Sequence, residues 1–154
     1  MNLGPSKWAE PYIGVPFQQQ GFSLEGCHCW GLVWLVYQQE LQKELNKYLT
    51  YTAANLRQAV KLFKGERCLD PWREISGPDI TDYVWKDFDV VMMLATERDK
   101  EKKRLVTLDG HVGVVAGRRR VLHVAEDICT SCMDANHPRI RGKILGIYRH
   151  KDLM

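Results

Sequence analysis

The stretch that decides the fold is GCHCWGLVWLVYQQEL, residues 26–41. Two cysteines flank a histidine at its start. The residues that follow are mostly apolar, and charged residues occur only near the end of the stretch. This spacing predicts a buried helix over residues 29–47. Cys29 falls in the first turn, where unpaired backbone N–H groups and the helix dipole stabilise an anion such as a thiolate. Cys29 therefore fits a nucleophile, although a cysteine that merely packs in the core fits the same position.

Length and composition indicate one ordinary domain over residues 1–154. The chain is 45% hydrophobic and 27% charged, as is typical of a soluble globular protein. Its net charge of +3 argues against a dedicated nucleic-acid binder. Five cysteines do not form an even disulfide framework. No signal-peptide core or membrane span is apparent, so we expect a protein made in the cytoplasm.

The rest of the chain reads as helices followed by antiparallel strands, which predicts an α+β domain. The charged residues 96–105 are most simply a solvated loop or hairpin tip, and residues 65–87 are turn-rich. The segments with a regular pattern are a second helix over 52–63, a buried strand over 89–94, a hairpin around Gly117 and a last strand over 143–150.

The hairpin brings two histidines together. A turn centred on Gly117 places His111 directly opposite His123, with Cβ atoms roughly 5 Å apart, and a one-residue shift makes them diagonal neighbours. Two adjacent imidazoles suit a relay in which one takes a thiol proton and the other fixes its tautomer. The alternative is a pair of half-exposed strand histidines without a catalytic role.

Several motifs, in order, resemble the NlpC family of papain-like cell-wall cysteine peptidases. GCHCWGLVWLVY resembles the nucleophile segment, DGHVGVV the motif of the catalytic base and VLHVAE the motif of the third catalytic residue. YIGVPFQQQGFSLEG is similar to the lead-in, FDVVMM to an internal strand and ILGIYRH to the closing strand. The resemblance spans residues 12–150.

The resemblance implies a fold, a reaction and three catalytic roles. Cys29 matches the nucleophile, His111 the general base and His123 the residue that orients the base. The implied fold is papain-like α+β, with the nucleophile helix packed on an antiparallel sheet. The implied reaction is amide hydrolysis through a thioester in peptidoglycan stem peptides, commonly at a γ-D-glutamyl bond to diaminopimelate, without a metal or cofactor.

Three departures from the family pattern concern substrate binding. Phe17 replaces a usual tyrosine, His28 a usual aspartate and Trp30 a usual serine, and all three are expected to shape the substrate pocket. Trp30 and the Tyr-Arg-His ending resemble short versions encoded with bacteriophage tail genes. Two hypotheses follow: a peptidase associated with a phage tail, which acts at the bacterial envelope, or a tail-assembly or tail-tip component with little activity.

The other cysteines leave two further alternatives open. Cys27 and Cys29 with Cys129 and Cys132 have the spacing of a zinc site, to which His137 could add a ligand. That alternative leaves His111 and His123 unexplained. The motif CTSC, residues 129–132, also resembles a thioredoxin-like redox pair, which needs a strand before it and a helix after it.

Overall fold

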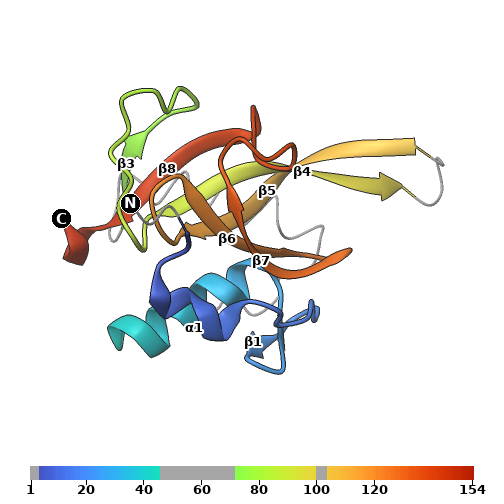
Figure 1. Ribbon diagram of the computed structural model, residues 1–154. Coiled ribbons are helices and arrows are strands. Elements are labelled where there is room, and N and C mark those ends of the chain that lie inside the picture. The colour runs from blue at the N-terminus through green and yellow to red at the C-terminus, as the bar shows by residue number, and fades with distance from the viewer. Residues whose placement is uncertain (1–3, 46–71, 100–103) are drawn as a thin grey trace.

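The computed structural model describes residues 4–45, 72–99 and 104–154 (Figure 1). Over these residues an α-helix packs on a six-stranded antiparallel sheet, so the α+β prediction is confirmed. The single domain over residues 1–154 stays a prediction. In chain order the elements are η1 (Lys7–Tyr12), β1 (Phe22–Ser23), β2 (Gly26–Cys27), α1 (Cys29–Leu41), β3 (Trp72–Ser76), β4 (Val90–Asp99), β5 (Arg104–Val115), β6 (Arg120–Ala125), β7 (Ile128–Asp134), β8 (Ile144–His150) and η2 (Lys151–Leu153).

Helix α1 is capped at both ends by its own sequence. At its start, the Nδ1 atom of His28 accepts a hydrogen bond from the backbone N–H of Gly31 at 2.6 Å. At its end, Gln42 adopts a left-handed conformation with φ 50°, and the Lys43 N–H bonds back to the Tyr37 carbonyl at 3.1 Å. A left-handed residue closes a helix, so α1 ends at residue 41 rather than at 47 as predicted.

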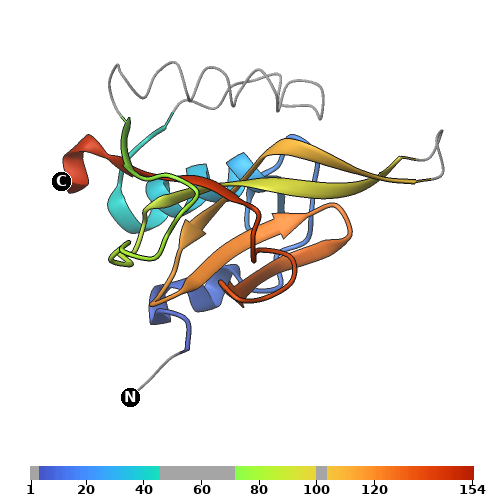
Figure 2. The ribbon, with the colours of Figure 1, turned by 90° about the horizontal axis from the view of Figure 1, so that it is seen from above.

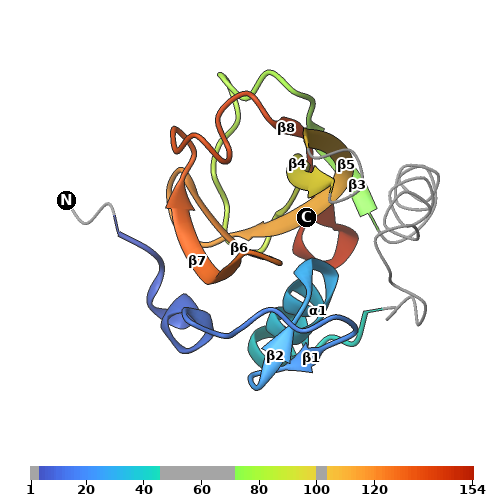
Figure 3. The ribbon, with the colours of Figure 1, turned by 90° about the vertical axis from the view of Figure 1, so that its right-hand side faces the viewer.

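The strands of the sheet follow the order β3-β8-β4-β5-β6-β7, and α1 lies along β5 and β6 (Figure 3). An apolar core lies on each face, because successive strand residues point to opposite sides. The core shared with α1 includes Val90, Met92, Val112, Val114, Leu122 and Val124. The core on the opposite face includes Val91, Met93, Val115, Val121, Ile140, Ile144 and Ile147.

The β5–β6 hairpin has a different register from the one predicted for a turn centred on Gly117. Val114 pairs with Leu122, and the loop spans residues 117–119. Gly117 and Arg119 both have positive φ angles, 113° and 58°, so the loop takes three residues and the strands shift. His111 and His123 are therefore diagonal neighbours on the same face and not directly opposite each other.

Two other segments differ from the sequence prediction. Strands β4 and β5 form a long arm that extends beyond the rest of the sheet (Figure 2), so most of the predicted loop over 96–105 is strand. Residues 100–103 and the predicted helix over 52–63 lie outside the described residues. Strands β3 and β7 were not predicted, because they lie at the two edges of the sheet and lack a continuous apolar run.

Close backbone contact fixes the lead-in segment against the start of α1. A Cβ atom on Gly31 would lie only 1.9 Å from the carbonyl oxygen of Gly21. Any side chain at position 31 would therefore push the lead-in away from the helix. The Gly26 and Gly31 positions together let residues 21–28 wrap tightly around the helix start that carries Cys29.

Candidate active site

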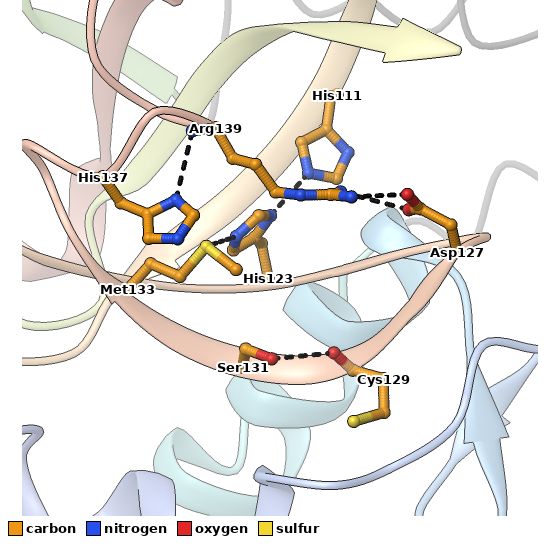
Figure 4. Close-up of polar contacts among 8 residues, drawn as sticks. All are labelled: His111, His123, Asp127, Cys129, Ser131, Met133, His137 and Arg139. Carbon is orange, nitrogen blue, oxygen red and sulfur yellow. Dashed lines mark hydrogen bonds and ion pairs between the residues drawn. The ribbon is translucent and has the colours of Figure 1, made fainter. Parts of the chain in front are cut away.

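The centre of the candidate site is a pair of histidines on adjacent strands (Figure 4). His111 on β5 and His123 on β6 approach each other with Nε2 of the first 2.9 Å from Nδ1 of the second. The rings meet edge to face at 71° with centroids 5.2 Å apart. His123 is only 2% exposed, so its nitrogens need partners within the protein. The prediction that these two imidazoles are neighbours is therefore correct, with the diagonal register.

Met133 decides which nitrogen of each ring carries the proton. Its Sδ atom lies 3.1 Å from Nε2 of His123, and a thioether can only accept a hydrogen bond. Nε2 of a neutral His123 is therefore the protonated nitrogen, and its Nδ1 is an acceptor. That acceptor takes the Nε2–H of His111, which leaves the lone pair of His111 on Nδ1. The network assigns His111 Nδ1 as the basic nitrogen of the pair.

Both imidazoles are neutral at physiological pH. Burial, with smaller contributions from the neighbouring His123 and Arg139, lowers the pKa of His111 to about 3. Burial lowers the pKa of His123 to about 4, again with a contribution from Arg139. A neutral His123 preserves the donor–acceptor chain that ends on Met133, because protonation of its Nδ1 would remove the acceptor for the Nε2–H of His111.

Acidification should destabilise the protein between about pH 6.5 and 4. The folded-state pKa of His28, His111 and His123 is about 4, 3 and 4, all below the ordinary value of 6.5. As pH falls, the unfolded chain takes up these protons first, so the free energy of unfolding decreases. Urea unfolding at pH 7 and 4.5 measures this loss, and a His123→Asn variant should lose less stability between the two pH values. Equal stability at both pH values in the parent protein would contradict the depressed pKa values.

Cys29 lies at the first residue of α1, as predicted, with 5% exposure. It belongs to the core between α1 and the sheet, together with Val112. His111 pairs with Met93, which belongs to the core on the opposite face of the sheet. The structure joins the two histidines to each other and to Met133 through hydrogen bonds.

Two features of the fold concern the position of His111 relative to the start of α1. Val112, the residue next to His111, packs in the same core as Cys29, and α1 lies against β5. A β-bulge follows Met93, directly beside its partner His111, where Leu94 pairs with residue 109. Bulges bend a strand and re-aim nearby side chains, and they are frequent next to active sites.

Cys27 contrasts with Cys29 although only two residues separate them. It is fully buried on β2, and burial raises the pKa of its thiol to about 11. A thiol with such a pKa is protonated at neutral pH and is a poor nucleophile. This supports the choice of Cys29 over Cys27 as the candidate nucleophile.

The three residues predicted to bind substrate surround the helix start. Phe17 is half-buried and forms an isolated β-bridge with Cys27. His28 is 3% exposed and caps α1, a task that aspartate also performs well. Trp30 is 3% exposed and meets Trp72 edge to face, with centroids 6.5 Å apart. Their roles in substrate binding stay predictions.

Sequence reasoning missed the residues that complete the histidine cluster. Met133 is on the unpredicted strand β7, and its register opposite Val121 puts it on the face of His123. Asp127, in the turn after β6, forms an ion pair with Arg139, in the loop before β8, and Figure 4 shows this pair beside the imidazoles. The spacing of these residues along the chain does not predict that they are neighbours, because the prediction would have required the position of β7.

The structure gives little support to the metal and redox alternatives. Within residues 4–45, 72–99 and 104–154, no three His, Cys, Asp or Glu residues gather as metal ligands, so Cys27, Cys29, Cys129, Cys132 and His137 form no such group. The CTSC motif lies inside strand β7, and no helix follows it as a thioredoxin-like motif requires.

None of the helices in the described ranges is long and apolar enough to cross a membrane.

The fold is the papain-like α+β class that the sequence predicted. Its solved neighbours include the NlpC/p60 domain of the peptidoglycan hydrolase SagA, with 14% identity, a TM-score of 0.52 and coverage of 92% of each chain. Another is a lipoprotein-like protein of the NLP/P60 family from Staphylococcus aureus, with 17% identity, a TM-score of 0.54 and coverage of 97% of this chain. The chain spans 44% of that second protein.

Comparisons by sequence add nothing to this likeness. No family model matches the chain, and no curated protein matches it. The structural likeness therefore shows the fold alone, and the reaction has to be inferred from the residues of the site.

Proposed function

We propose that this chain is a cysteine peptidase that hydrolyses amide bonds in peptidoglycan stem peptides. The observation that carries the proposal is the His111–His123 pair, joined at 2.9 Å on the two strands against which the Cys29 helix packs. An NlpC/p60 fold shared with the domain of a peptidoglycan hydrolase supports the choice of substrate class. The bond between γ-D-glutamate and diaminopimelate is the proposed point of cleavage.

Each residue has a distinct role in the proposed reaction. The Nδ1 lone pair of His111 takes the proton from the Cys29 thiol as its sulfur attacks the amide carbon. The positive end of the α1 dipole stabilises the oxyanion. His111 then gives the proton to the leaving amine, and water hydrolyses the thioester with the same base. His123 and Met133 keep the other proton of His111 on Nε2, so that Nδ1 is the nitrogen that takes up and releases the proton.

Digestion of purified peptidoglycan tests the proposal directly. The parent protein should release peptides whose masses correspond to cleavage after γ-D-glutamate. Mass spectrometry of the soluble products identifies the bond, and peptidoglycan incubated with a Cys29→Ala variant is the matched control. Unchanged peptidoglycan with the parent protein, in parallel with folded protein by circular dichroism, would contradict a peptidase function.

A second candidate is a phage tail-assembly or tail-tip component that keeps the fold for binding. The observation in its favour is that Cys29 belongs to the core on one face of the sheet, whereas Met93, the strand partner of His111, belongs to the core on the other face. Such a protein should bind stem peptides or tail proteins without cleaving peptidoglycan. The tail association itself rests on the resemblance at Trp30 and residues 148–150, and co-purification with tail proteins from a lysate of the producing cells would test it.

A further inference from the structure

The ion pair between Asp127 and Arg139 lies beside the histidine cluster (Figure 4). One terminal nitrogen of Arg139 donates to Oδ1 of Asp127 at 3.1 Å, and the other donates to Oδ2. The Arg139 side chain is 38% exposed and the Asp127 side chain 64%. A ligand from solvent can therefore reach both groups. Figure 4 shows the guanidinium extending past the imidazoles towards Asp127.

The charges of this pair act on the candidate base. Arg139 lowers the pKa of His111, and Asp127 raises it, so both groups lie within electrostatic range of the ring. The same two residues act on His123 in the same directions. A substrate group held by Arg139 would consequently lie within electrostatic range of the histidine pair.

The backbone of Arg139 is fixed although its side chain is exposed. Its N–H donates to Nδ1 of His137 at 3.1 Å. The next residue, Ile140, is fully buried in the core on the histidine face, and its N–H bonds to the His137 carbonyl at 2.8 Å. A fixed backbone and an oriented guanidinium reduce the entropy lost when a ligand binds.

Asp127 leaves part of the guanidinium open. Both hydrogen bonds to Asp127 use the terminal nitrogens, and a guanidinium has five N–H donors in a planar fork. For the described residues, the Nε–H edge of Arg139 therefore remains for another planar acceptor.

We propose that Arg139 binds the free α-carboxylate of the γ-linked glutamyl residue in the substrate, with Asp127 orienting the guanidinium. This inference rests on the proposed function for the identity of the peptide. A γ-linked glutamate keeps its α-carboxylate, which the α-carbon and two methylene groups separate from the amide to be cleaved. An arginine fork recognises a planar carboxylate through two parallel hydrogen bonds, which a neutral amide cannot match.

Binding to a protein that cannot turn over its ligand tests the proposal separately from the reaction. The probes are L-alanyl-γ-D-glutamyl-diaminopimelate and the same tripeptide with the glutamyl α-carboxylate replaced by a carboxamide. In the Cys29→Ala background, calorimetry should show roughly 10- to 100-fold tighter binding of the carboxylate peptide. Arg139→Gln should remove this preference, and Arg139→Lys should keep part of it, because lysine retains the charge but not the fork.

Arg141→Gln is the matched control. Arg141 is exposed on the same loop two residues later, so the substitution removes the same charge without touching the fork. The preference for the carboxylate should survive it. Equal binding of the two peptides in the Cys29→Ala protein, or equal effects of Arg139→Gln and Arg141→Gln, would overturn the proposal. A preference that depends on Arg139 would support it even if the parent protein cleaves no peptide, an outcome that contradicts only the peptidase function.

Discussion

Cys29→Ala should abolish peptide hydrolysis, with a loss in kcat on the order of 10⁶-fold. Removal of the nucleophile eliminates the thioester route altogether, and the residual rate would come from binding and oxyanion stabilisation alone. The substitution deletes a single sulfur atom from a site that is 5% exposed, so the fold should persist. Release of peptides from peptidoglycan, measured by mass spectrometry against time, gives the rate.

Cys27→Ala is the control for this experiment. Cys27 is also buried and close in sequence, but burial raises the pKa of its thiol to about 11 and keeps it protonated. The Cys27→Ala protein should retain most of the parental rate at a modest cost in stability. If the Cys29→Ala protein retains activity and the Cys27→Ala protein loses it, the assignment of the nucleophile is wrong.

His111→Ala should lower kcat roughly 10²- to 10⁴-fold, the usual contribution of a positioned general base. His123→Asn should cost less, because asparagine can still offer an acceptor to the Nε2–H of His111. The difference in kcat between the two variants separates the contribution of proton transfer by His111 from that of its orientation by His123. Steady-state kinetics on a stem peptide measures it.

Met133 provides a sharper test of the tautomer assignment. A Met133→Leu substitution keeps the volume and apolar character but removes the acceptor for Nε2 of His123. Nitrogen-15 shifts of the two rings should then show His123 exchanging between tautomers. Unchanged shifts in Met133→Leu, or equal total losses of kcat in His111→Ala and His123→Asn, would contradict the proposed division of roles.

The sequence predicted those parts of the structure that depend on local pattern. The apolar run after Cys29 marked the helix, and two β-branched runs around Gly117 marked the hairpin that brings His111 and His123 together. The exact register of the β5–β6 hairpin depended on the positive φ of Arg119. A non-glycine residue seldom adopts such an angle, and no sequence pattern predicts it. The early end of α1 at Gln42 has the same cause, a left-handed residue that is not glycine.

The remaining parts of the site depend on contacts between distant segments. Met133 meets His123 only because the edge strand β7 pairs with β6, and Arg139 reaches Asp127 only after the chain has turned beyond β7. Side-chain periodicity cannot reveal such contacts when the strand itself lacks an apolar alternation. The pairing of His111 with Met93, a residue of the core on the face away from α1, also follows from strand register and not from motif order.

The position of β7 at the edge of the sheet has a consequence for how the protein opens. Central strands such as β5 are held on both sides, so their amides exchange with solvent only in large openings, whereas edge strands exchange by local fraying. His111 and His123 stand on inner strands, but the sulfur that fixes their tautomers stands on the fraying one. Each brief detachment of β7 would free the Nε2 proton of His123. The basic nitrogen of His111 could then alternate between Nδ1 and Nε2. The lifetime of one edge strand would then set how long the histidine pair keeps a single proton arrangement.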